Sequence, residues 1–72
     1  MNRETLKENF NKVLNNGIIK CEITIDDIPR IIVIYKCKGT DIIQFSIEGD
    51  CVVDFEDLPT DMLNKIYEQL KR

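Results

Sequence analysis

The sequence predicts an α+β fold: a two-layer α-β-β-β-β-α sandwich, in which a four-stranded antiparallel meander carries both helices on one face. Three observations support this prediction. Apolar residues recur at helical spacing near both ends of the chain, they alternate with polar residues in the middle, and short turn motifs separate the alternating runs. Because the chain has only 72 residues and no internal repeat, we expect a single domain over residues 1–72.

The first helix is expected over about residues 3–15, since one stripe of its surface would be apolar. This stripe consists of Leu6, Phe10, Val13 and Leu14. Thr5 with Glu8 has the spacing of a capping box, although Asn2 could equally cap an earlier start. Gly17 supplies a residue that can adopt the left-handed conformation at the helix end.

Four strands should follow, each with alternating residues on its two sides. The first begins near residue 18 and ends before "DDIPR", because aspartates favour turns and Pro29 cannot donate a ladder hydrogen bond. The second is "RIIVIYKCK", the third follows "KGTD", and the fourth follows "EGD". The inward residues of the first, third and fourth strands would be Ile19, Cys21, Ile23, Ile25, Ile43, Phe45, Ile47, Cys51, Val53 and Phe55.

A second amphipathic helix is expected in the last segment, "DLPTDMLNKIYEQLKR". Pro59 would lie in the first turn, where proline is tolerated, and the acidic and basic ends of the segment suit the helix dipole. The apolar stripe consists of Leu63, Ile66, Tyr67 and Leu70. Two helices with one such stripe each would cover one face of the sheet.

The second strand is unusual because five consecutive residues, 31–35, are apolar. A register that opposes Ile25 to Ile31 places Ile31, Val33, Tyr35 and Cys37 on the core face. It leaves Ile32 and Ile34 on the helix-free face, near Val52. Since apolar clusters on an open sheet face mark interfaces, we expect Ile32, Ile34 and Val52 to contact a second copy of the chain or another protein.

Acidic residues are concentrated in residues 39–64, which contain seven carboxylates and no basic side chain. The candidate acidic surface consists of Asp50, Asp54, Glu56, Asp57 and Asp61. These residues are typical of turns, helix starts and a solvated strand face. Alternatively, they could mimic a phosphate backbone, and either interpretation predicts no direct binding to nucleic acid, because phosphate would be repelled.

Enzymatic and metal-dependent functions are not expected. The sequence has no histidine, and its three cysteines lack the close spacing of metal or redox motifs and would face the core. No cofactor, catalytic residue or metal ligand is therefore predicted. No apolar run approaches the roughly 20 residues that span a bilayer, so we expect a cytoplasmic protein without membrane contact.

The composition includes twelve Ile, seven Lys and six Asn, which hints at an AT-rich bacterial or phage origin. The sequence thus predicts a small non-catalytic interaction module, a self-associating accessory protein. The alternative is an acidic nucleic-acid mimic that inhibits a DNA- or RNA-acting enzyme.

Overall fold

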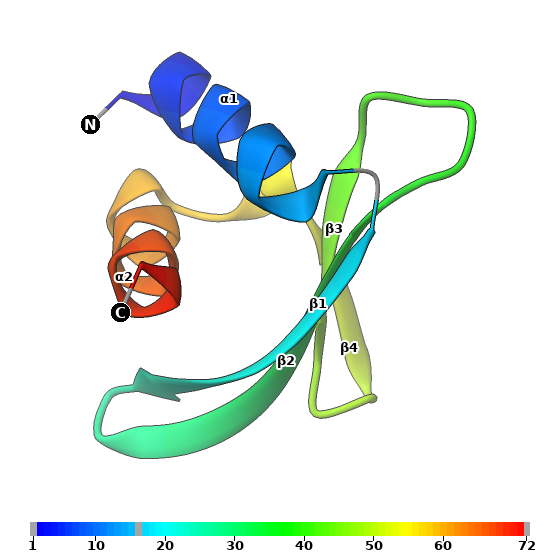
Figure 1. The fold of residues 1–72 in the computed structure, drawn as a ribbon. Helices are drawn as coiled ribbons and strands as arrows, with labels where there is room; N and C mark the ends of the chain where they lie inside the picture. Colours follow the sequence, from blue (N-terminus) through cyan, green and yellow to red (C-terminus); the bar gives the residue numbers. More distant parts are fainter. Residues whose placement is uncertain (1, 16, 72) are drawn as a thin grey trace.

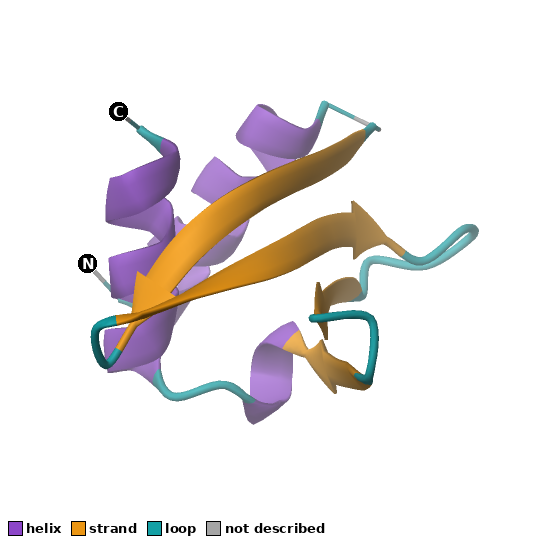
Figure 2. Ribbon diagram, turned by 90° about the horizontal axis from the view of Figure 1, so that it is seen from below, coloured by secondary structure: helices purple, strands orange, loops and turns teal. Residues whose placement is uncertain are grey.

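The computed structural model describes residues 2–15 and 17–71 and confirms the α+β fold with a four-stranded antiparallel meander (Figure 1). The elements are α1 (Arg3–Leu14), β1 (Ile18–Ile25), β2 (Ile28–Lys36), β3 (Ile43–Ile47), β4 (Cys51–Asp54), the 3-10 helix η1 (Phe55–Asp57) and α2 (Thr60–Leu70). The strands lie in the order β1-β2-β3-β4. Both α-helices lie on the same side of a strongly twisted sheet (Figures 1 and 2).

The core fills the space between this sheet and the two helices. Phe10 of α1 lies near its centre, with ring centroids 5.6 Å from Phe45, 6.0 Å from Phe55 and 5.6 Å from Tyr67. Edge-to-face ring contacts of this kind add to the stabilisation that burial itself provides. The buried apolar residues are Leu6, Phe10, Leu14, Ile23, Ile32, Ile34, Ile43, Phe45, Phe55, Leu58, Leu63 and Ile66.

Helix α1 begins at the earlier of the two predicted caps. The Asn2 Oδ1 atom accepts a hydrogen bond from the Thr5 backbone N–H at 2.8 Å, which satisfies one of the free donors of the first turn. At the other end Asn15, with φ 45°, supplies the left-handed residue that had been expected at Gly17. Val13 was expected in the apolar stripe, but its side chain is exposed.

A short 3-10 turn, η1, connects β4 to the second helix. Phe55, predicted as the end of the fourth strand, opens η1 and is buried there, and Pro59 is the N-cap of α2. Arg3 joins this connection to α1, because its guanidinium donates to the carbonyl oxygens of Leu58 at 2.7 Å and Phe55 at 2.8 Å. The same guanidinium lies 5.4 Å from the centroid of the Phe55 ring.

The register of β1 and β2 differs from the prediction. Asp26 and Asp27 both have positive φ, at 52° and 64°, and form a two-residue hairpin loop in which Ile25 pairs with Ile28. The predicted pairing of Ile25 with Ile31 is therefore displaced by three residues. Because a shift by an odd number exchanges the two faces of a strand, every side chain of β2 points opposite to the prediction.

Pro29 lies inside β2, opposite Thr24, although it was expected to interrupt the strands. Its position is tolerated because β3 ends at Ile47, opposite Ile32, so no neighbouring strand needs a hydrogen bond from residue 29 on that side.

Candidate functional site

Ile32 and Ile34, the two predicted interface residues of β2, are fully buried in the core. They face the helices and pair with Cys21 and Ile19 of β1. Their placement on the open face of the sheet was wrong because the two-residue loop sets a different register. Val52, the third predicted interface residue, does lie on the open face and is exposed.

The open face of the sheet carries a different apolar cluster, which we call the outer patch. It consists of Ile18, Ile31, Val33, Tyr35 and Val52. The register sets Ile18 beside Tyr35, and Ser46 lies between Val33 and Val52. Ile18 is 71% exposed, Val52 55% and Ile31 40%.

A polar row crosses three strands at one end of the outer patch. The Tyr35 hydroxyl donates to Gln44 Oε1 at 3.0 Å, and Gln44 Nε2 donates to Asp54 Oδ1 at 2.8 Å. These bonds restrain the aromatic ring and leave its apolar body half-buried on the open face. A restrained aromatic side chain loses little entropy on contact with a partner, so Tyr35 is well suited to an interface.

The residues of the candidate acidic surface extend from the β3–β4 turn to the first turn of α2. Glu56 lies 3.6 Å from Lys7 of α1, and Asp54 accepts the hydrogen bond from Gln44. Asp50, Asp57 and Asp61 are exposed in the turn, in η1 and at the start of α2. Two of the five predicted acidic residues therefore have local partners.

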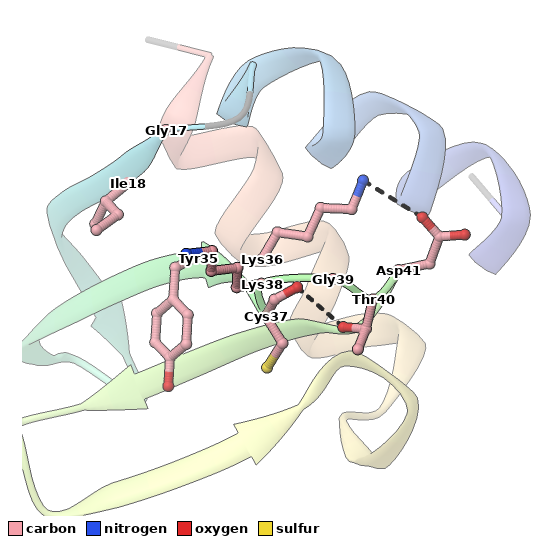
Figure 3. Close-up of a pocket in the computed structure, with 9 residues that line it drawn as sticks. All are labelled: Gly17, Ile18, Tyr35, Lys36, Cys37, Lys38, Gly39, Thr40 and Asp41. Carbon is pink, nitrogen blue, oxygen red and sulfur yellow. Dashed lines mark hydrogen bonds and ion pairs between the residues drawn. The ribbon is translucent and has the colours of Figure 1, made fainter.

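A surface depression lies beside the β2–β3 loop and is open to solvent (Figure 3). Lys36 Nζ lies 3.4 Å from Asp41 Oδ1, and the Thr40 hydroxyl donates to the Cys37 carbonyl oxygen at 3.0 Å. These polar groups therefore hold the loop together. Among the described residues, no group of three or more His, Cys, Asp or Glu side chains could hold a metal ion.

The three cysteines were expected to face the core. Cys21 is partly buried, with its Sγ atom 3.6 Å from the Ile32 carbonyl oxygen, and burial raises the pKa of its thiol. Cys37 is partly buried beyond the end of β2 and lines the depression. Cys51 lies on the predicted face of the sheet, opposite Ile47, but it is exposed and not buried, because the helices do not cover the β4 end of the sheet.

The sequence contained a signal for the correct register. The two aspartates 26 and 27 separate two apolar residues, Ile25 and Ile28, and aspartate tolerates the left-handed conformation that a two-residue hairpin loop requires. A two-residue loop at these aspartates predicts the observed register, with Ile31, Val33 and Tyr35 on the open face.

Among the described residues, no helix is long and apolar enough to cross a membrane. Comparisons of the chain with family models, with curated proteins and with solved structures gave no significant match.

Proposed function

We propose that the chain is a small non-catalytic protein-interaction module that self-associates through its outer patch. The observation that carries this proposal is the apolar row on the helix-free face of β2, in which Ile31 is exposed and Val33 and Tyr35 are half-buried. An antiparallel sheet can leave one face in water, but that face is then normally polar. Contiguous apolar side chains on an open face are typical of interaction surfaces.

A second copy of the chain is the occupant that the surface favours. The centre of the patch contains no charged residue, whereas Lys20 lies at its β1 margin and Asp54 at its β4 margin. A two-fold axis parallel to the strands sets the β1 margin of one copy over the β4 margin of the other, which brings Lys20 of one copy toward Asp54 of the partner. Burial of each aliphatic side chain would contribute about 1.5–3 kcal/mol, which is valuable to a domain with a small core.

The alternative function, an acidic mimic of nucleic acid, has weaker support. Asp50, Asp57 and Asp61 are exposed, but Glu56 is paired with Lys7 and Asp54 with Gln44. Purification of a basic nucleic-acid enzyme with the chain, and loss of that partner when Asp57 and Asp61 are replaced by asparagine, would favour the alternative.

Multi-angle light scattering after size exclusion tests the proposal. The wild type at high micromolar concentration should have at least twice the mass of one chain, and Ile31→Lys with Val33→Lys should halve the observed mass. Val13→Lys is the matched control, because Val13 is 41% exposed, against 40% for Ile31, but lies on α1. A wild type with the mass of one chain, or a double variant that is folded by circular dichroism and keeps the wild-type mass, would refute the proposal.

A further inference from the structure

Strand β1 forms one edge of the sheet, and its backbone is only partly covered. Gln69 of α2 covers Thr24: the Thr24 N–H donates to Gln69 Oε1 at 2.9 Å, and Gln69 Nε2 donates to the Thr24 carbonyl oxygen at 3.0 Å. The backbone groups of Thr24 therefore point away from β2. Because the direction alternates along an antiparallel strand, those of Lys20 and Glu22 point the same way.

No hydrogen bond from another element of the described chain covers this edge at Lys20 or Glu22. Both side chains are exposed on the outer face of the sheet. The edge thus offers two residues whose N–H and C=O groups are available to a further strand.

The opposite edge of the sheet, β4, is less suitable for pairing with a second copy. Its outward-pointing residues include Asp54, and Asp50 and Glu56 flank the strand. Two such edges would bring like charges together, which is a common protection against strand pairing. Lys20 and Glu22 give the β1 edge one charge of each sign instead.

We propose that β1 pairs in antiparallel orientation with β1 of a second copy, about a two-fold axis that passes beside Cys21. Three registers oppose outward-pointing residues among Lys20 and Glu22. An axis at Lys20 sets two lysines face to face, and an axis at Glu22 sets two glutamates face to face. Only the axis at Cys21 opposes Lys20 to the partner's Glu22, and it does so twice.

This register forms four backbone hydrogen bonds, since Lys20 and Glu22 each exchange both groups with the opposed residue. It also sets Cys21 directly opposite the partner's Cys21, in a pair whose Cα atoms lie about 4.5 Å apart. The ladder ends at Thr24, where Gln69 already occupies the backbone. The pairing goes beyond the proposed function, because it uses the edge of the sheet and leaves the outer patch of both copies free.

The two surfaces do not compete for the same symmetry axis. Edge pairing places its two-fold axis perpendicular to the sheet, whereas packing of the outer patches needs an axis that runs parallel to the sheet, between the two copies.

Oxidative cross-linking through Cys21 tests the edge pairing. In a background with Cys37→Ser and Cys51→Ser, diamide should join two copies: each Cys21 thiol loses one proton and one electron to diamide, which becomes the hydrazine as the S–S bond forms. Lys20→Glu alone and Glu22→Lys alone should each lower the yield of cross-linked dimer about tenfold, because like charges then face each other twice. An equimolar mixture of the two variants should restore the yield and contain the mixed dimer, identified by mass spectrometry.

Two results would overturn the edge pairing: no cross-linked dimer in the parent at high micromolar concentration, or equal yields in the parent and both single variants. The outer-patch variant, Ile31→Lys with Val33→Lys, should keep the cross-link in the same background. The charge variants test the edge pairing through the yield of the cross-link, and the outer-patch variant tests the proposed function through the mass. Failure of either proposal therefore leaves the other testable.

Discussion

The two faces of β2 have similar side chains but opposite environments. Ile32 and Ile34 are fully buried beneath the helices, whereas Ile31 is exposed and Val33 and Tyr35 are half-buried on the open face. Apolar character alone therefore does not tell which face of such a strand belongs to the core. The hairpin loop decides it, because the loop fixes the register and the register assigns each side chain to a face.

The largest expected effect comes from the covered face. Ile34→Ala removes a fully buried side chain from the core and should lower the free energy of unfolding by about 2–5 kcal/mol. Ile31→Ala on the open face should lower it by less than about 1 kcal/mol. Urea denaturation compares the two variants at a protein concentration at which light scattering gives the mass of one chain. Equal losses would contradict the assignment of faces.

A second prediction concerns the connection that holds the helices over the covered face. Arg3→Ala removes two hydrogen bonds to carbonyl oxygens and the contact with the Phe55 ring, so we expect a loss of about 1–2 kcal/mol. Lys12→Ala, on the exposed side of α1, is the control and should have little effect. The same chemical-denaturation measurement applies, and a small effect of Arg3→Ala would show that this connection adds little stability.

The loop that sets the register provides a third prediction. Asp27 has a φ of 64°, a conformation that glycine adopts more easily. Asp27→Gly should therefore raise the free energy of unfolding by about 0.5–1 kcal/mol, and Asp27→Val should lower it. The midpoints of thermal unfolding measure both changes. A destabilised glycine variant would argue against the two-residue loop.

The labelling rates of the cysteines in the wild type measure how well the helices cover each part of the sheet. Cys51 is exposed and should react first with iodoacetamide at pH 8, while Cys21 should react more slowly, because burial limits access and raises the pKa of its thiol. Because the pKa of Cys21 is raised in the folded state, the folded protein holds the thiol proton more tightly than the unfolded chain does. The contribution of Cys21 to the free energy of unfolding is therefore present at neutral pH and falls as the pH rises through the folded-state pKa. Peptide mass spectrometry at several times gives the order. Faster labelling of Cys21 would mean that the helix layer does not cover it.

Periodicity was sufficient to predict both helices, the four strands and the inward residues of β1 and β3. Ile23, Ile43 and Phe45 are buried as predicted, because alternation against polar residues leaves only one apolar side. In β2 both sides are apolar, so periodicity carries no information about faces. The interface prediction therefore depended entirely on the loop.

Other differences arise at the ends of elements, where periodicity does not show what covers a residue. Val13 lies at the end of α1 and is exposed, and Cys51 extends past the cover of the helices. Phe55 is buried as predicted, but through a 3-10 turn that follows the strand. Coverage depends on where the helices lie over the twisted sheet, and local sequence patterns do not specify that placement.

The dependence of thermal stability on protein concentration tests the central claim most directly. If a second copy covers the outer patch, the midpoint of unfolding of the wild type should rise as the concentration increases from low to high micromolar, because association stabilises the folded state by mass action. In Ile31→Lys with Val33→Lys, this rise should largely disappear, while Val13→Lys should keep it. A wild-type midpoint that stays constant over the whole range, or a double variant with the same rise as the wild type, would contradict the role of the open face of β2.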